Sequence, residues 1–508
     1  MLIVGGGWAG LAAAVRGCEL GFAVTLLEAT RTWGGRARTL ARHGDAANAS
    51  SAPSGPGAEP DTDGACASPN GARLDNGQHI LIGAYTATLG LMQRLGLDLG
   101  AHLHAMPLDL RFAEGGGLAT PDWALRWPAP FDTLAALLSV RGWSWAERLA
   151  LLRWAAHWQR AGFVCAPQLS VADLCAELPE RVWHELIEPL CVAALNTPAQ
   201  TASAQVFLIV LRDALLGRGH PPWRAAQLLL PRSDLGALLP GPAVRWLQQR
   251  GAVALAGQRV LSLERVAAGM VGGVNGATAA ATPSVAAGGW RLTCSSGQVF
   301  EAEHVILATP ASAATRLLGT LPPDQASAQL HAWRQTAQAL QHQAIATLYV
   351  GGVLSRPWPS AHPMLALRSS AQAPAQYAFR RDRLLGAPGS ASGCPQGWVE
   401  LALVASACDG SQSELQTVLL QQAQHALGLE QAQVRQCVIE RRATFASTPG
   451  LTRPAAALGP GLWAAGDYVS GPYPATLEGA VRSGEQAAEG AAQQAASVRA
   501  AQAHPASD

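Results

Sequence analysis

The sequence predicts an α/β fold in which a parallel sheet begins at the N-terminus and is completed near the C-terminus, with a largely helical region inserted between the two. Three observations predict it. An apolar strand, a glycine-rich turn and a helix-like run open the chain at residues 2–15. A short apolar strand at 461–465 ends in glycine and leads through a turn into a helix. Helix signals fill most of residues 97–227.

The opening segment has the order of a βαβ unit. Its strand, Leu2–Val4, runs into Gly5–Gly10, where glycine occupies the first, third and sixth positions of G-x-G-x-x-G. The first glycine permits a tight turn, the second lets the backbone approach a pyrophosphate, and the third lets helix and strand pack closely. A second strand at 23–27 ends on Glu28, which is placed to accept hydrogen bonds from a ribose. A turn that binds no ligand would leave this acid unexplained, so the segment predicts a dinucleotide site.

Two further blocks complete that site. Gly34, Gly35 and Arg36 form a second flexible turn, whose arginine can clamp the same pyrophosphate from the opposite side. Far along the chain, Gly466 and Asp467 close the late strand just before the final turn and helix. With these blocks the chain resembles the FAD-dependent amine oxidase and phytoene desaturase superfamily.

The resemblance implies a Rossmann-like FAD-binding domain of the GR2 type with an inserted α+β substrate domain that is largely helical. It implies that Asp467 contacts the ribityl and pyrophosphate part of FAD, and that Val260 meets the adenine region through its backbone. The last helix, beginning near Thr476 and Leu477, would point its N-terminus at the flavin ring, because that end favours the negative charge of reduced flavin. The predicted cofactor-binding residues are Gly5, Gly7, Trp8, Ala9, Gly10, Glu28, Gly34, Gly35, Arg36, Val260, Gly466, Asp467, Thr476 and Leu477.

Internal blocks narrow the resemblance. Residues 74–79, 188–198, 442–446 and 473–480 are similar to the squalene-associated branch of the superfamily, the hydroxysqualene dehydroxylases. That branch implies that reduced FAD removes the hydroxyl of hydroxysqualene to give squalene, in bacterial squalene and hopanoid biosynthesis. Two alternatives stay open. One is an FAD-dependent polyene desaturase of the carotenoid or phytoene type, or an amine oxidase. The other is a non-catalytic isoprenoid-lipid carrier with the same fold.

Two side chains are candidates for the proton donor that an alcohol needs before its hydroxyl can leave as water. His79 follows a block that the resemblance places near the flavin, and an imidazole can exist in either protonation state near neutral pH. Tyr473 is the second candidate, as a hydroxyl donor beside the flavin. The alternative is structural: His79 would be satisfied by the backbone or packed on FAD, and Tyr473 would form an aromatic wall.

Composition excludes several classes of protein. The chain has 508 residues, 49% of them hydrophobic and 14% charged, so it can bury a large core. The net charge is +1 and no basic cluster is present, which argues against nucleic acid as a partner. Nine scattered cysteines without a C-x-x-C pair predict reduced thiols, and an isolated pair, His102 and His104, predicts no metal site.

The same features predict where the protein acts. Met1 is followed directly by the first strand, without the features of a secretory signal, and no apolar run reaches the roughly 18–20 residues of a spanning helix. We therefore expect a cytoplasmic protein on the inner face of the cytoplasmic membrane. A hydrophobic isoprenoid substrate, a peripheral membrane contact and an electron donor that the sequence does not identify are the expected partners.

Domain limits follow from these blocks. The FAD-binding domain is predicted at 1–96, 228–320 and 441–490, the helical substrate region at 97–227, its sheet at 321–440, and a flexible tail at 491–508. Segments near 41–72, 267–289 and 386–396 are rich in Ala, Ser, Gly and Pro and predict flexible inserts. In the helical region, Ser144 to Glu147 is a capping box, and Trp145, Leu149, Leu152 and Ala156 share one predicted helix face. The region's tryptophans could line an apolar pocket, sit at a membrane surface or pack in the core.

Overall fold

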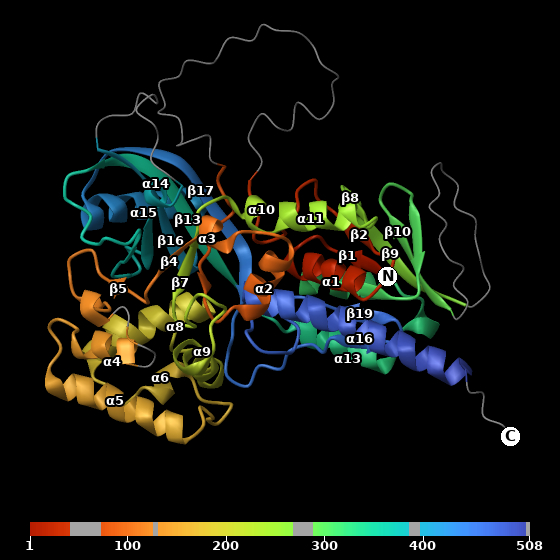
Figure 1. Cartoon of the computed structure of the whole chain (residues 1–508), viewed down its shortest axis with the longest axis horizontal. Coiled ribbons are helices and arrows are strands. Elements are labelled where there is room, and N and C mark those ends of the chain that lie inside the picture. Colours follow the sequence, from red (N-terminus) through yellow and green to blue (C-terminus); the bar gives the residue numbers. More distant parts are fainter. Residues whose placement is uncertain (41–72, 125–126, 128–130, 268–287, 386–396, 504–508) are drawn as a thin grey trace, which may run out of the picture.

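The computed structural model describes residues 1–40, 73–124, 127, 131–267, 288–385 and 397–503 (Figure 1). The predicted inserts lie outside these described residues, apart from residues 267, 288 and 289. The tail predicted after residue 490 belongs, as far as residue 503, to the last helix.

A six-stranded sheet forms the base of the cofactor-binding half, in the order β18-β19-β12-β1-β2-β8. β1 pairs in parallel with β12 and β2, and β19 and β8 extend the sheet on either side in the same direction, while β18 is antiparallel. The sheet therefore joins segments from both ends and the middle of the chain. Its strands are β1 (Leu2–Val4), β2 (Thr25–Glu28), β8 (Val253–Ala256), β12 (Val305–Leu307), β18 (Ala457–Gly459) and β19 (Leu462–Ala464).

Both faces of this sheet are covered, which is why its parallel strands are apolar without alternation. Ile3, Leu26 and Ile306 face one cluster, and Val4, Leu27 and Leu307 face another. The first cluster contains α1 (Trp8–Glu19), α2 (Thr86–Arg94), α11 (Pro240–Gln249) and α16 (Leu477–Ala503). The second contains β9 (Val260–Val266), β10 (Gly289–Cys294), α12 (Ala311–Leu318) and α13 (Ala328–Gln338), and β11 (Val299–Ala302) completes the β9–β10 sheet.

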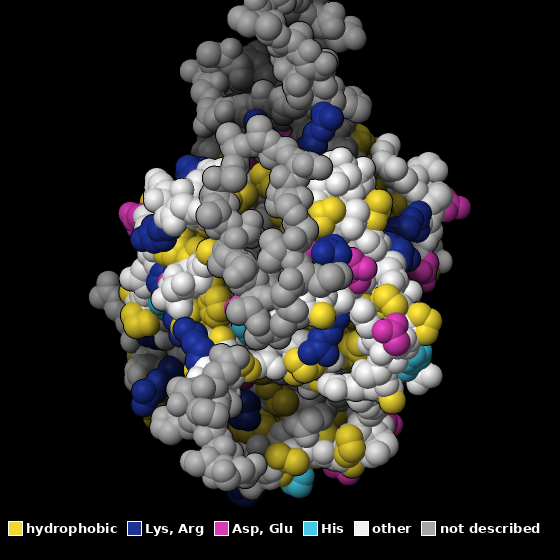
Figure 2. All heavy atoms as spheres, turned by 90° about the vertical axis from the view of Figure 1, so that its right-hand side faces the viewer, with side chains coloured by type: hydrophobic (Ala, Val, Ile, Leu, Met, Phe, Trp, Pro, Cys, Tyr) yellow, Lys and Arg dark blue, Asp and Glu magenta, His cyan; other side chains and the backbone are white. Residues whose placement is uncertain are grey.

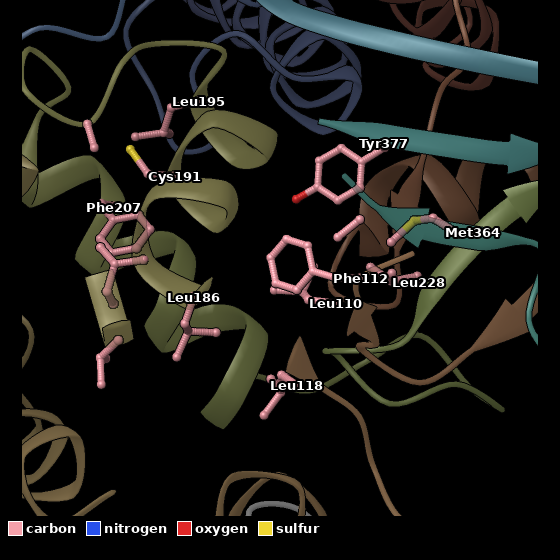
Figure 3. Packing of buried hydrophobic residues seen from close by; sticks show 14 of the residues in the cluster. Leu110, Phe112, Leu118, Leu186, Cys191, Leu195, Phe207, Leu228, Met364 and Tyr377 are labelled. Atoms are coloured by element: carbon pink, nitrogen blue, oxygen red, sulfur yellow. The ribbon is translucent and has the colours of Figure 1, made fainter. Parts of the chain in front are cut away.

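The other half is built on an antiparallel five-stranded sheet in the order β14-β15-β16-β13-β17. α15 (Gln412–Leu427) packs on one face of it. On the other face, Leu195, Phe207 and Leu186 from the helices lie across from Tyr377 and Met364 of the sheet (Figure 3). The strands are β13 (His342–Leu354), β14 (Met364–Ala366), β15 (Tyr377–Arg380), β16 (Trp398–Cys408) and β17 (Leu429–Phe445).

The helices on this other face lie together at one end of the molecule, at the lower left of Figure 1. They are α4 (Phe131–Leu138), α5 (Trp145–Arg160), α6 (Val171–Leu174), α7 (Glu180–Val182), α8 (Glu188–Leu195) and α9 (Ala204–Leu216), with a π-helical turn at Trp183–Ile187 joining α7 to α8. Shorter elements complete the chain: α3 (Leu99–His102), α10 (Leu235–Leu238), α14 (Arg381–Leu385), β3 (Leu81–Ile82), β4 (Leu103–Met106), β5 (Leu110–Arg111), β6 (Gly117–Leu118) and β7 (Leu228–Pro231). 3₁₀ turns lie at Asp122–Ala124 and Pro323–Gln325.

The predicted α/β class, with a Rossmann-like sheet and a largely helical insertion, is confirmed. The domain limits stay predictions; β17 runs through the limit placed between residues 440 and 441. No helix within the described part of the chain is both long enough and apolar enough to cross a bilayer.

The cap predicted for α5 is confirmed, and its predicted apolar face is divided between solvent and core. The capping box at Ser144 and Glu147 is present, with both reciprocal hydrogen bonds. On the predicted apolar face, Trp145 is 67% exposed and Leu149 45% exposed, while Leu152 packs, partly buried, against the core. The buried side chain of this helix is Leu151, so α5 turns to the core a face beside the predicted one.

Candidate functional site

A cavity of about 570 Å³ lies between the six-stranded sheet and the five-stranded sheet. Segments from the first 40 residues and from residues 466–480 line the same cavity, as predicted from the distant glycine blocks. Of the residues predicted to bind the cofactor, those that line it are Gly5, Gly7, Trp8, Ala9, Glu28, Gly34, Gly35, Arg36, Val260, Gly466, Asp467, Thr476 and Leu477. Gly10 does not.

Each glycine of the first turn is needed for a different physical reason. Gly5 has φ of +110°, and a Cβ there would lie 2.4 Å from the carbonyl oxygen of Ala308. A Cβ on Gly10 would lie 1.8 Å from the carbonyl oxygen of Gly5, so this glycine allows α1 to pack on its own turn. Gly7 is different, because its nearest neighbour would be the Cα of Gly35 at 3.8 Å. The turn is therefore open at Gly7, facing the cavity.

Glu28 is buried at the end of β2 and holds the glycine turn as well as lining the cavity. Its Oε2 accepts the Gly6 N–H at 2.6 Å, and its Oε1 accepts both the N–H and the hydroxyl of Thr30 at 2.8 Å. Each carboxylate oxygen has more than one lone pair, so acceptance from a ribose hydroxyl is compatible with these bonds. Beside its predicted contact with the ribose, Glu28 thus has a structural role in the glycine turn.

Arg36 and Asp467 were each predicted to contact the cofactor, and in the structure they form an ion pair with each other. Arg36 Nη2 donates to Asp467 Oδ1, and its Nη1 donates to the carbonyl oxygen of Ala443 at 2.8 Å. Burial is the largest single effect and lowers the pKa of Arg36, but the Asp467 carboxylate, with smaller contributions from Glu440 and Tyr468, raises the pKa of the guanidinium overall. The pair therefore places a fixed positive and a fixed negative charge side by side on the cavity wall.

The cavity fits a dinucleotide cofactor on an observation independent of the motifs. The hydroxyls of Thr309 and Tyr468 are buried, line this cavity and have no hydrogen-bond partner among the described residues. An unsatisfied buried polar group is costly, and the phosphate, ribose and ribityl oxygens of FAD are suitable partners. α1 also begins at Gly7 without a side-chain cap, which leaves its N-terminus to an anion.

His79 lines the cavity, as predicted. Its Nδ1 lies 3.0 Å from the carbonyl oxygen of Gly77, so Nδ1 carries a proton and Nε2 is an acceptor in the neutral ring. Burial lowers the pKa of His79, against a smaller opposing effect of the Gly77 carbonyl. The neutral ring is the favoured form, and an acid role requires protonation of Nε2.

Tyr473 does not line the cavity, so its predicted role as a donor beside the flavin is not supported by its placement. Its ring packs edge-on against Tyr85 at 6.3 Å, and the guanidinium of Arg482 lies 5.2 Å from the ring centroid. Tyr85 lines the cavity instead, a residue that the motifs did not single out. Burial raises the pKa of both phenols, which makes them hydrogen-bond donors and poor acids.

The end of the cavity between α8 and the five-stranded sheet is apolar, and this part was missed from the sequence. Its lining is formed by Ile80, Ala193, Ala194, Leu195, Ile345, Tyr377, Phe379 and Val404. Three polar residues interrupt it: Asn196, Ser406 and Thr444. Asn196 ends α8 in the left-handed conformation, with φ of +46°, and is buried.

Asn196 is held in a single orientation. Its Oδ1 accepts the N–H of Ala407 at 2.7 Å, and its Nδ2 donates to Oγ1 of Thr444 at 2.8 Å. Because the amide fills a lone pair of the Thr444 hydroxyl, the proton of that hydroxyl is left to point elsewhere. Thr444 therefore presents a hydrogen-bond donor at the edge of an apolar pocket.

Comparisons with known proteins agree with this geometry. Residues 8–492 match the family model described as flavin-containing amine oxidoreductase. Hydroxysqualene dehydroxylases from Rhodopseudomonas palustris and Sinorhizobium fredii are each 27% identical, over 96% of this chain and 97% of theirs. The crystal structure of a putative protoporphyrinogen oxidase from Exiguobacterium has the same fold, with a TM-score of 0.60 at 17% identity over 97% of this chain and 98% of that one. The chain belongs to the flavin-containing amine oxidoreductase family and is an FAD-dependent oxidoreductase.

Proposed function

We propose that the protein removes the hydroxyl of hydroxysqualene, using reduced FAD, and releases squalene and water. The observation that carries the proposal is the apolar end of the cavity with the Thr444 hydroxyl held by Asn196 at its edge. A long hydrocarbon with one hydroxyl matches both parts, because its oxygen accepts from Thr444 while its chain lies on apolar side chains. The names and extent of the 27% identical relatives support the same substrate.

FAD, when reduced, supplies the hydride that replaces the departing hydroxyl. The protein's own residues have three tasks. The apolar lining excludes water, Thr444 orients the C–O bond, and His79, when protonated on Nε2, gives its proton to the leaving oxygen. One hydride and one proton added to the alcohol yield the hydrocarbon and one water, so the reaction is balanced.

The alternatives fit the cavity less well. A polyene desaturase acts on a hydrocarbon, which offers no acceptor for the donor at Thr444. An amine substrate would be cationic, and each acidic residue of the described lining already faces a donor or a cation: Glu28 accepts from the glycine turn, and Glu440 and Asp467 both act on the charge of Arg36. A carrier without a cofactor would have no use for the open turn at Gly7.

Anaerobic single turnover tests the function. The holoprotein, reduced with dithionite, is mixed with hydroxysqualene while flavin reoxidation is followed by absorbance and products by mass spectrometry. We expect squalene in a one-to-one ratio with oxidised flavin. Absence of squalene, or desaturation of an added polyene by the oxidised enzyme, would overturn the proposal.

A pair of variants tests the subsite. Thr444→Val keeps the shape of the side chain but removes the donor, and should slow squalene formation by roughly tenfold, the scale of one hydrogen bond. Thr444→Ser retains the hydroxyl and should stay within a few-fold of the wild type. Equal rates in Thr444→Val and the wild type would show that Thr444 takes no part in the mechanism. The reaction itself is tested separately, by the single-turnover experiment.

A further inference from the structure

Exposed large apolar side chains are concentrated in one short stretch of the chain. Residues 123–149 supply seven of the fourteen such side chains among the described residues, including every exposed tryptophan and phenylalanine. They are Trp123 at 61% exposure, Trp127 at 45%, Phe131 at 55%, Leu134 at 37%, Leu138 at 38%, Trp145 at 67% and Leu149 at 45%. Scattered exposed apolar residues need no explanation, whereas their concentration in one segment is typical of a contact surface.

Helical spacing arranges these side chains in stripes. In α4, Phe131, Leu134 and Leu138 fall at i, i+3 and i+7, and in α5, Trp145 and Leu149 fall at i and i+4. The rings of Trp123 and Trp127, at the 3₁₀ turn before α4, meet edge-on at 5.0 Å. Both helices lie at the outer end of the molecule, far from the six-stranded sheet (Figure 1). We call these seven side chains the aromatic patch.

The chain segment that carries α4 and α5 has an excess of basic residues. Residues 131–160 contain four arginines, at 141, 148, 153 and 160, and two acidic residues. The guanidinium of Arg148 lies 5.0 Å from the ring centroid of Trp145, and Arg141 and Arg153 are exposed. One of the acids, Glu147, is already held by the N-cap Ser144 and by Arg181 at 3.9 Å. The opposite end of the molecule, seen in Figure 2, instead mixes apolar, basic and acidic side chains.

We propose that the aromatic patch inserts into the interface of a lipid bilayer that carries anionic headgroups. Tryptophan favours the boundary between headgroups and acyl chains, leucine and phenylalanine enter the acyl region, and the arginines meet the phosphates. A second copy of the chain is a poorer occupant, because a two-fold contact would bring the same arginine-flanked surface against itself. The inference concerns a surface that the proposed reaction does not use.

Flotation of the FAD-loaded full chain with vesicles tests it. The probes are vesicles of phosphatidylcholine alone and of phosphatidylcholine with phosphatidylglycerol. We expect the protein to float with the anionic vesicles, more weakly with the neutral ones, and less as salt is added. Replacing two members of the patch, by Trp145→Glu together with Leu149→Glu, should lower the bound fraction by roughly tenfold or more, the scale for two large apolar side chains.

The matched control carries the same change at the other end of the molecule. Leu261 and Val299 are 52% and 44% exposed on β9 and β11, and Leu261→Glu with Val299→Glu should float like the wild type. Flavin absorbance per protein should be equal in all three proteins, which shows that each is folded.

A wild type that never floats, or a patch variant that floats normally, would overturn the proposal. The proposal would also be overturned if light scattering showed a wild-type dimer that the patch variant dissociates, while the wild type bound no lipid. Squalene formation from detergent-dispersed substrate is scored separately, so failure of the reaction leaves this test intact.

Discussion

Gly7 and Gly10 belong to the same turn but have different neighbours, and this difference gives a prediction. Gly7 has φ of −76°, and a Cβ there would make only an ordinary contact with the Cα of Gly35 at 3.8 Å, so Gly7→Val should fold but place its side chain where the pyrophosphate would bind. We expect FAD affinity to fall by roughly 10–100-fold, the scale of an overpacked contact. Flavin absorbance per purified protein measures it.

The matched variant is Gly10→Val, whose Cβ would collide with the Gly5 carbonyl oxygen inside the protein. That variant should lose thermal stability even without FAD, whereas the apoprotein of Gly7→Val should melt like the wild-type apoprotein. Full flavin occupancy in Gly7→Val would show that the turn does not hold the pyrophosphate.

His79 predicts a pH dependence. An acid must begin protonated, and burial places the pKa of His79 below its ordinary value of about 6.5. The rate of single-turnover flavin reoxidation should therefore be highest below the lowered pKa and fall as pH rises through it. His79→Gln should reduce the low-pH rate by roughly 100-fold, as for loss of a general acid, and remove this dependence. A rate within a few-fold of the wild type, with the same pH profile, would reassign His79 to packing against the flavin.

Contacts between helices depend on a carboxylate that no motif singled out for a role. Glu478, fully buried at the start of α16, accepts the N–H groups of Ala87 and Thr88 at 3.0 and 2.9 Å. It thereby caps α2, whose own N-cap residue, Tyr85, gives no side-chain bond. Glu478 Oε1 also accepts from Arg482 at 2.7 Å, so the capping group is itself fixed in place.

Glu478→Ala should therefore lower the free energy of unfolding by roughly 2–4 kcal/mol, because it leaves the N–H groups of Ala87 and Thr88 without their acceptor and removes the carboxylate partner of Arg482. Denaturant unfolding of the apoprotein measures the change. Glu489→Ala in the same helix is the control: its pair with Arg16 is 42% exposed on the Glu489 side, and the loss should stay within about 1 kcal/mol. Similar losses in both variants would mean that the cap contributes nothing beyond an ordinary surface ion pair.

Sequence reasoning succeeded where the information was local. The glycine turn, the strand ending on Glu28, and the Ser144–Glu147 cap are each written within a few consecutive residues. It failed where function depends on contacts across the chain. Asn196 and Thr444 both lay in blocks used for the family resemblance, but their hydrogen bond joins residues 248 positions apart. The pattern of α5 gave the shared face of Trp145 and Leu149 but left its surroundings open, because periodicity gives a stripe without saying whether a core faces it.

The cofactor joins the two ends of the chain, which predicts how the protein responds to its loss. The cavity wall combines the first 40 residues with residues 466–480, so FAD stabilises both segments together. With free FAD at 100 times its Kd, linkage adds about 2.7 kcal/mol to the free energy of unfolding. Removing FAD should lower Tm and increase hydrogen exchange in α1 and at the start of α16, with little change in α15. An apoprotein with the same Tm and exchange pattern would contradict this coupling.

The strand order of the six-stranded sheet has a consequence for biosynthesis. β1 is made first, yet one of its two neighbours, β12, begins at residue 305. At about 5–20 residues per second, roughly 15–60 s of translation separate the two strands. Throughout that time the emerging chain carries an apolar strand with an unpaired edge, the kind of surface on which nascent chains aggregate. Ribosome-bound fragments that stop before residue 305 should therefore bind holdase chaperones and resist compaction, and release should follow once β12 has left the exit tunnel.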